Sequence, residues 1–220
     1  MRLPQRILVV GAHCDDVELL AGGLLARACR EMHSVSVLVF SDHRSVLSAA
    51  EARLARDEMR ANVAALAASG APVVDLTDRL LGACNGDFDR ERASIYAAME
   101  VVRDRCDLVV THSPSDTNQD HQRVAAEAVR VFKAHATLLA GEFPNNDVGG
   151  FRAQVYVPLE AGDVAAKATM LERYESQKRH ERPYLDGDLV RAQARVRGAQ
   201  VRVGFAEAFE VLGRLIIRGD

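Results

Sequence analysis

The chain has 220 residues, of which 48% are hydrophobic and 27% are charged, and its formal net charge is −3. This length suits one α/β domain with a sizeable core, so we expect a single domain over residues 1–220. A slightly acidic chain has no general affinity for nucleic acid or for an anionic membrane surface. No apolar stretch approaches the roughly 18 residues that a membrane-spanning helix needs. We therefore expect neither a nucleic-acid partner nor a membrane partner.

The cysteines and the N-terminal residues indicate the cellular compartment in which the protein is expected. The four cysteines, Cys14, Cys29, Cys84 and Cys106, form no C-x-x-C pair. The N-terminal residues contain no apolar core of a signal peptide. Both features are typical of a protein of the reducing cytoplasm, where structural disulfides are rare. The sequence leaves open whether the chain forms a homo-oligomer.

The first apolar run, Ile7–Val10, ends in a small turn and is followed by His13, Asp15 and Asp16. A short β-branched run of this kind is typical of a buried parallel strand. Ligands of open α/β sheets bind outside the carboxyl ends of the strands, so these side chains should project into that crevice. An imidazole and a carboxylate at this spacing can bind one metal ion while a neighbouring carboxylate stays free as a base. The plainer alternative is a structural histidine beside a capping aspartate. A dinucleotide-binding turn is disfavoured because two glycines of G-x-G-x-x-G are missing.

Helices and strands then alternate along the chain. Apolar periodicity predicts helices over 19–29, 48–69 and 90–105, strands over 34–40 and 73–76, and a loop over 78–89. The segment after the strand over 34–40 contains His43, which would face the same crevice as the first motif. Arg53 and Arg56 lie about one turn apart on the long second helix, on one face.

A second polar cluster follows the apolar strand over 108–110. Its candidate functional side chains are His112, Asp116, Asn118, Asp120 and His121. The apolar stripe of the residues after it predicts a helix whose first turn holds Asp120 and His121. This second cluster favours a metal site over a lone structural histidine.

The remaining residues complete the alternation. We expect strands over 137–140, 154–158 and 209–217, and a helix over 164–180. The turn-rich loop from Glu142 to Gly150 should form a substrate rim, because loops on a rigid scaffold carry specificity. Strands that alternate with helices predict an α/β domain with a Rossmann-like, mainly parallel sheet flanked by helices.

Two motifs together carry a family resemblance. Ala12-His13-Cys14-Asp15-Asp16 and Asn118-Gln119-Asp120-His121 resemble the A-H-P-D-D and H-x-D-H motifs of the LmbE/PIG-L family of zinc-dependent N-deacetylases. The resemblance continues through Lys167, Tyr174-Glu175-Ser176-Gln177, Arg197-Gly198-Ala199 and Ala206-Glu207-Ala208-Phe209, so it covers nearly the whole chain. It implies an LmbE-like fold.

The resemblance also implies a set of roles. His13, Asp16 and His121 would hold one Zn²⁺ per chain, although another divalent metal would also suit this set. Asp15 would be the general base. An arginine near Arg53 and Arg56 would help to hold substrate; on the residues alone, a solvated helix face explains them equally well. The implied reaction removes an N-acetyl group from an amino-sugar-containing small molecule and gives a free amine and acetate.

Two alternatives to that function stay open. One is a zinc amidase that acts on a non-sugar or thiol-conjugate amide, and the other is a metal-retaining binding protein without turnover. A Ser-His-Asp hydrolase is disfavoured because the chain has no G-x-S-x-G motif.

The departures from the family motifs raise further questions. Asn118 stands where the family has a histidine; its amide can donate a hydrogen bond to an oxyanion but carries no transferable proton. Acid catalysis then rests on Asp15 alone, or another histidine reaches the site, for which His112 is a better candidate than His43. A capping or packing role in the loop explains His112 equally well. Asp120 acts in catalysis or orients a ligand histidine instead. Cys14, in place of proline, is a small packing residue, a redox-sensitive thiol or an extra soft metal ligand.

Overall fold

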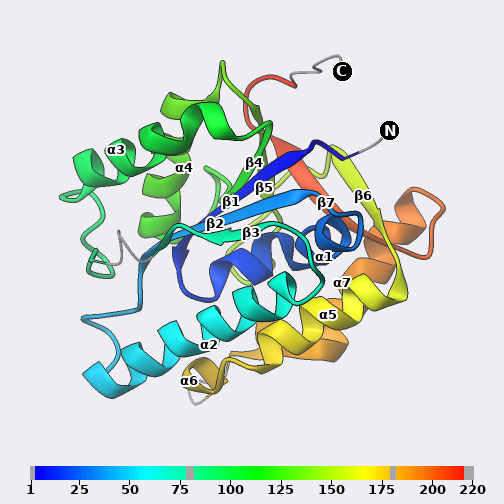
Figure 1. Cartoon of the computed structure of the whole chain (residues 1–220), viewed down its shortest axis with the longest axis horizontal. Helices are drawn as coiled ribbons and strands as arrows, with labels where there is room; N and C mark the ends of the chain where they lie inside the picture. Colours follow the sequence, from blue (N-terminus) through cyan, green and yellow to red (C-terminus); the bar gives the residue numbers. More distant parts are fainter. Residues whose placement is uncertain (1–2, 78–81, 179–181, 216–220) are drawn as a thin grey trace.

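The computed structural model describes residues 3–77, 82–178 and 182–215, and these residues form a seven-stranded sheet in the order β3-β2-β1-β4-β5-β7-β6 (Figure 1). The strands are β1 (Arg6–His13), β2 (Ser34–Ser41), β3 (Val73–Asp75), β4 (Leu108–Thr111), β5 (Thr137–Gly141), β6 (Val155–Leu159) and β7 (Phe205–Val211). The pairings from β3 to β5 are parallel, and β7 pairs antiparallel with both β5 and β6. The α/β class with a mainly parallel sheet is confirmed.

Helices cover both faces of the sheet (Figure 1). One face carries α1 (Asp16–Arg30), α2 (Ala49–Ala67), α5 (Ala161–Glu172) and α7 (Gly187–Gln200), and the other carries α3 (Arg92–Val102) and α4 (Gln119–Phe132). The short elements are α6 (Glu175–Lys178) and the 3-10 turns Arg103–Arg105 and Pro183–Leu185. None of the described helices has the length and apolar character needed to cross a membrane.

The central strand β1 is buried on both sides because its side chains alternate between two cores. Ile7 and Val9 pack into the core under α1, whereas Leu8 and Val10 pack into the core under α4. All four are at most 1% exposed. Burial of one such aliphatic side chain stabilises the fold by about 1.5–3 kcal/mol. The strand is therefore a rigid support for the polar residues at its carboxyl end.

Helix α1 is broken at Ala21, whose φ and ψ are −152° and 23°. The break leaves backbone groups without helical partners. A buried ion pair supplies them: Lys167 Nζ donates to the Leu19 carbonyl at 2.7 Å, and Glu207 accepts from the N–H groups of Gly23–Leu24 at 2.9 and 2.6 Å. The two charges also pair with each other at 2.7 Å. The ion pair thus provides hydrogen-bond partners for backbone groups on both sides of the break in α1.

The glycines at this break are required for close packing. A Cβ on Gly22 would lie 2.8 Å from Lys167 Cγ, and a Cβ on Gly23 would lie 2.5 Å from Leu159 Cδ1. A Cβ on Gly141 of β5 would lie 2.4 Å from the Leu20 carbonyl oxygen. Only glycine therefore lets the sheet, α1 and α5 approach this closely.

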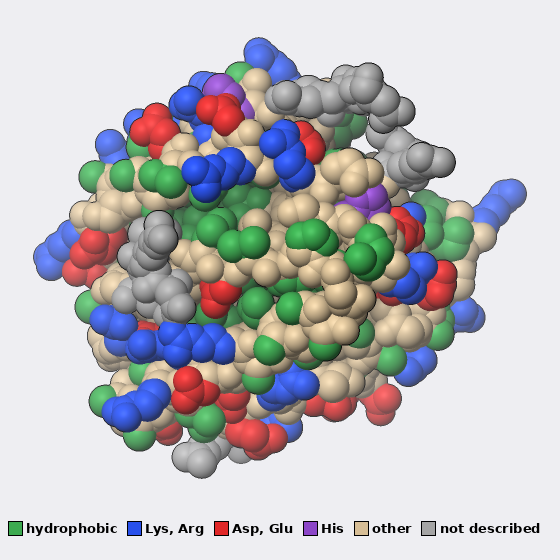
Figure 2. Space-filling model, viewed as in Figure 1, with side chains coloured by type: hydrophobic (Ala, Val, Ile, Leu, Met, Phe, Trp, Pro, Cys, Tyr) green, Lys and Arg blue, Asp and Glu red, His purple; other side chains and the backbone are tan. Residues whose placement is uncertain are grey.

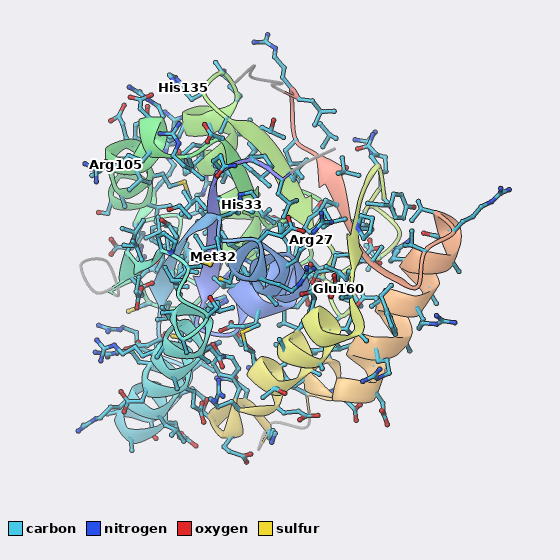
Figure 3. The ribbon with its side chains drawn as sticks, turned by 45° about the vertical axis from the view of Figure 1, so that its right-hand side comes forward. Arg27, Met32, His33, Arg105, His135 and Glu160 are labelled. Atoms are coloured by element: carbon cyan, nitrogen blue, oxygen red, sulfur yellow. The ribbon has the colours of Figure 1, made fainter. Side chains whose placement is uncertain are left out.

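The second half of α1 is fastened to the edge strand β6. Arg27 Nη1 donates to the Pro158 carbonyl at 2.9 Å and ties the end of α1 to β6. Figure 3 shows Arg27 and Glu160 on these neighbouring parts of the chain. On the face in Figure 2, Lys and Arg side chains are interspersed with Asp and Glu, so charges of both signs alternate there.

Several element boundaries differ from the sequence prediction. The helix predicted over 164–180 is two helices, because α5 ends at Glu172 and α6 begins at Glu175; His180 lies outside the described residues. The last strand is 205–211 rather than 209–217, and residues 216–217 lie outside the description, as do 78–81 of the predicted loop. Helix α7 was not predicted. It buries Val190, Ala194 and Gly198, a stripe of small side chains that gives little apolar signal.

Candidate metal centre and active site

Parallel pairing of β1 with β4 brings the two sequence motifs to one edge of the sheet. Ile7, Leu8 and Val9 pair in register with the first residues of β4. His13 is the last residue of β1, and the second motif runs from the end of β4 into the first turn of α4. As a result His13 and His121, which are 108 positions apart, have ring nitrogens 3.3 Å apart.

Three donor atoms, His13 Nδ1, Asp16 Oδ2 and His121 Nε2, form a nearly equilateral triangle. The two imidazole nitrogens are 3.3 Å apart, and each lies 3.4 Å from Asp16 Oδ2. A tetrahedral Zn²⁺ with bonds of about 2.0–2.1 Å spaces its donors by about 3.3–3.4 Å. The three side chains are buried and form one of the groups in the described residues that could hold a metal ion.

Each of these histidines also has a carboxylate on its other ring nitrogen. His13 Nε2 lies 3.2 Å from Asp120 Oδ2, and His121 Nδ1 lies 2.8 Å from Asp116 Oδ2. Such carboxylate partners fix the tautomer and the orientation of metal-binding histidines. Of the two roles left open for Asp120, its position favours the orienting one, because it contacts His13 and does not line the cavity described below.

Neighbouring groups shift the pKa values of His13 and Asp16 away from what burial alone would give. Burial alone lowers the pKa of His13, but hydrogen bonds to Asp120 and Asp16 raise it to about 9. Burial alone raises the pKa of Asp16, yet the nearby His121 holds it well below its usual range. Metal ligands bind in their deprotonated forms, so a metal ion that binds here displaces the His13 proton.

His112 lies behind this triangle. It is fully buried, its ring stacks on His121 with centroids 3.8 Å apart, and its Nε2 accepts a hydrogen bond from the Ala12 N–H at 3.0 Å. Burial, followed by the nearby His121, lowers its pKa, so the ring is neutral at pH 7. His112 does not line the cavity, and the structure therefore does not bring it to the place where a substrate would bind.

A cavity of about 370 Å³ opens over the triangle. Besides His13, Asp16 and His121, it is lined by Asp15 and His43, by Arg182, by the aromatic rings of Phe143 and Tyr184, and by Asn85, Asn118, Asn145 and Asn146. Its size falls in the range of small-molecule sites, about 300–1,000 Å³. Amide groups both donate and accept hydrogen bonds, so the wall suits a polar, hydroxyl-rich ligand.

Asp15 lies beside the triangle and is 2% exposed. His43 Nε2 is 3.2 Å from its Oδ1, and Arg182 Nη1 donates to its Oδ2 at 3.3 Å. Burial by itself raises the pKa of Asp15, but the neighbouring His43 and Arg182 outweigh burial and hold this pKa below its ordinary value. The carboxylate is therefore ionised at neutral pH and able to accept a proton.

The two ends of the Asn118 amide have different roles. It is the N-cap of α4, where its Oδ1 accepts the Asp120 N–H at 2.9 Å. This bond fixes the amide plane, and no described residue accepts a hydrogen bond from Nδ2. Since Asn118 also lines the cavity, its N–H₂ group is available there as a neutral donor.

The residues predicted to bind substrate are not all brought together. Arg56 pairs with Asp42, Arg53 is exposed, and neither lines the cavity. Glu142 pairs with Arg197 and faces a separate small cavity of about 20 Å³ beside α5 and α7. His43, the fourth residue of this set, lines the main cavity.

Sequence reasoning missed four residues of the cavity wall, Asn85, Arg182, Pro183 and Tyr184. Asn85 and Arg182 lie in irregular segments, and Pro183 and Tyr184 lie in the short 3-10 turn Pro183–Leu185, where no periodicity or motif marks them. Cys14 is fully buried, and burial raises the pKa of its thiol well above the usual value. This favours the packing role, and the Tyr174 hydroxyl donates to the Cys14 carbonyl to hold the turn that proline would stiffen.

The fold and the site define an α/β protein with a candidate His₂Asp metal centre at the carboxyl edge of a mainly parallel sheet. The family model described as PIG-L, GlcNAc-PI de-N-acetylase, matches residues 8–132. The chain belongs to this family, and the family resemblance predicted from the sequence is confirmed. No curated protein sequence matches it.

Solved structures share the fold. The conserved protein TT1542 from Thermus thermophilus has a TM-score of 0.71 at 22% identity, over 98% of both chains. The N,N'-diacetylchitobiose deacetylase from Pyrococcus horikoshii has a TM-score of 0.71 at 14% identity, over 95% of this chain and 84% of that one. The 4-carboxy-2-hydroxymuconate hydratase GalB from Pseudomonas putida has a TM-score of 0.68 at 18% identity, over 97% and 99%. Because both a deacetylase and a hydratase carry this fold, fold similarity alone does not assign the reaction.

Proposed function

We propose that this chain is a zinc-dependent N-deacetylase that hydrolyses the N-acetyl group of an amino-sugar-containing small molecule to a free amine and acetate. The observation that carries the proposal is the equal-sided triangle of His13, Asp16 and His121 beside the ionised Asp15. Membership of a de-N-acetylase family supports the reaction class. The cavity above the triangle supports a small-molecule substrate.

The donor set fits the metal that the family implies. Two imidazole nitrogens and one carboxylate oxygen are ordinary ligands of a catalytic Zn²⁺, which keeps a further position open. Their spacing matches a tetrahedral ion, and Asp120 and Asp116 hold the two rings in place. Zn²⁺ bound there would supply Lewis acidity and polarise the scissile carbonyl. One ion per chain is expected, because the candidate groups in the described residues share His121.

Asp15 moves the proton in this proposal. Its carboxylate accepts a proton from the attacking water as the new C–O bond forms at the acyl carbon. It returns that proton to the nitrogen as the C–N bond breaks, so that the products are a neutral amine and acetic acid, which ionises in water. Positioned acid–base groups of this kind contribute about 10²–10⁴-fold to a rate. The contact with Arg182 holds Asp15 in its charged form before water attacks.

Asn118 and the other asparagines bind and orient the substrate. The Asn118 amide would donate to the acyl oxygen as it gains negative charge, the task of a preorganised oxyanion donor. Asn85, Asn145 and Asn146 offer donors and acceptors for hydroxyl groups. The ring of Tyr184 offers a flat apolar surface to a sugar ring.

One observation favours a second candidate function. The family motif has an imidazole where this chain has Asn118, and a site without that group could keep its metal and ligand but lose turnover. The chain would then be a metal-retaining binding protein. Asp15 favours turnover instead, because a binding protein has no need for an ionised carboxylate beside the donor triangle.

The test uses the purified full chain. After metal removal, it is reloaded with Zn²⁺, Fe²⁺ or Co²⁺, metal content is measured, and amine release is followed from a panel of N-acetylated amino sugars and non-sugar amides. Asp15→Asn is the control, since it keeps the volume of the side chain and removes the base. We expect one metal ion per chain in both proteins and amine release in the wild type alone. Bound metal without turnover on any amide would support the binding protein.

A further inference from the structure

The structure places an imidazole in the cavity from a part of the chain that the family motifs do not include. His43 follows β2, which pairs with β1 so that Ser41 is the register partner of His13. The His43 ring stacks on the His13 ring, with centroids 5.0 Å apart and planes 13° apart. It lines the cavity together with Asn118, whereas His112 does not. The group that Asn118 lacks is therefore present close by.

The backbone of His43 has an unusual conformation. Its φ is 62°, in the left-handed region that favours glycine, and the residue is 3% exposed. Such a conformation is strained for a residue with a Cβ. The His43 carbonyl accepts hydrogen bonds from the N–H groups of Val46 and Leu47, at 3.1 and 3.0 Å, which hold the turn. Glycine would fit this turn without strain, so the imidazole is retained at a cost, a pattern found at functional sites.

Neighbouring side chains set which ring nitrogen carries the proton. Ser41 Oγ donates to Asn85 Oδ1 at 2.8 Å, which directs the amide N–H₂ of Asn85 away from Ser41. Asn85 Nδ2 then faces His43 Nδ1 at 3.5 Å and donates to it. A neutral imidazole that accepts at Nδ1 carries its hydrogen at Nε2. His43 is thus prepared as a donor at Nε2.

This Nε2 is buried and lacks an aligned partner. It lies 3.2 Å from Asp15 Oδ1, but among the described residues no acceptor has hydrogen-bond geometry toward it. A buried N–H without a hydrogen bond is unfavourable. His43 is part of the cavity wall, so a ligand bound in the cavity is the candidate partner for this N–H.

We propose that His43 Nε2 donates a hydrogen bond to the acyl oxygen of the scissile amide, and so does the work of the histidine that the family motif has at position 118. The inference rests on the proposed function, since it assigns a role in the same reaction. His43 and the Asn118 amide form a pair of donors, one from the loop after β2 and one from the N-terminus of α4.

Variants at position 43 separate donation from structure. His43→Gly relieves the positive φ and removes the donor, whereas His43→Gln keeps an amide N–H close to the place of Nε2. We expect kcat to fall by about 10²–10³-fold in the Gly variant, the usual loss for one oxyanion donor, with KM and metal content unchanged. The Gln variant should retain kcat within about tenfold of the wild type. A purely structural role would instead change the metal content, KM or Tm.

A second change tests the exchange of imidazoles directly. Asn118→His in the His43→Gly background restores an imidazole at the family position, and it should recover at least about tenfold of the lost kcat. Wild-type kcat in His43→Gly, or a loss explained by reduced metal content, would overturn the inference while leaving the proposed function in place. A metal-loaded wild type that cleaves no amide would overturn both together.

Discussion

Replacement of Asn118 by serine separates its two functions. Serine is as good an N-cap as asparagine, so the serine hydroxyl should still accept the Asp120 N–H that Asn118 accepts at 2.9 Å. The serine side chain is too short to present a second donor to the cavity. The variant therefore keeps the start of α4, and with it His121, and removes only the amide N–H₂ group.

The expected effects can be stated for each function. Loss of one oxyanion donor lowers kcat by about 10²–10³-fold, equivalent to about 2.7–4 kcal/mol of transition-state stabilisation. Because the cap is kept, the free energy of unfolding should change by less than about 0.5 kcal/mol. Asn118→Ala is the matched control, and loss of the cap should lower that free energy by about 1 kcal/mol in addition to the same loss of kcat.

The assay combines amine release at saturating substrate with urea unfolding of the metal-loaded protein. Wild-type kcat in Asn118→Ser would refute the donor role of the amide. A fall in stability equal to that of Asn118→Ala would refute the capping role. A rise in KM with unchanged kcat would mean that Asn118 binds ground state and transition state equally.

Other predictions address the metal, the base and the fold. Asp15→Asn should lower kcat by about 10²–10⁴-fold at unchanged metal content, as amine release and metal analysis would show. Removal of the metal by a chelator should abolish turnover and lower Tm, and a free metal concentration of about 100 times Kd should restore about 2.7 kcal/mol of stability. Asp116→Asn should weaken metal binding by about 10–100-fold in a competition titration, whereas the exposed Asp57→Asn should not. Glu207→Gln leaves Lys167 buried without its counter-ion and should cost about 3–5 kcal/mol in urea unfolding; a smaller loss than about 1 kcal/mol would show that the ion pair does not stabilise the broken helix.

The parts of the fold that the sequence predicts well depend on local signals. Ile7–Val10 and Leu108–Val110 are apolar runs that end in polar residues, and both form central parallel strands. The rule that parallel strands present their carboxyl ends at one edge then places His13 beside His121. To predict that His13 lies beside His121, it is enough to recognise the two strands and to expect that they are neighbours in the sheet.

The parts that sequence reasoning missed depend on the direction of a side chain or on segments distant along the chain. His112 and His43 both follow a strand end, and His112 was the better candidate to reach the site. The positive φ of His43 brings its ring to the cavity, while His112 packs behind His121, and no pattern in the sequence distinguishes these turns. Arg182 meets Asp15 only because the chain returns to the site after α6.

The ion pairs of Glu142 and Arg56 are a further feature that sequence patterns did not predict. Both residues are near the carboxyl edge of the sheet, where substrate-binding residues were expected. Each side chain is instead occupied by a partner of opposite charge, Arg197 and Asp42 respectively. Pairing between distant charges cannot be derived from spacing along one helix or loop.

The central claim is that His13, Asp16 and His121 hold a metal ion that serves amide hydrolysis. The most direct measurement is metal content per chain together with acetate and amine release, in the wild type and in His121→Ala. We predict one metal ion per wild-type chain, equal amounts of acetate and amine, and loss of both metal and turnover in the variant. Full metal content in His121→Ala, or turnover by the metal-free wild type, would contradict the account.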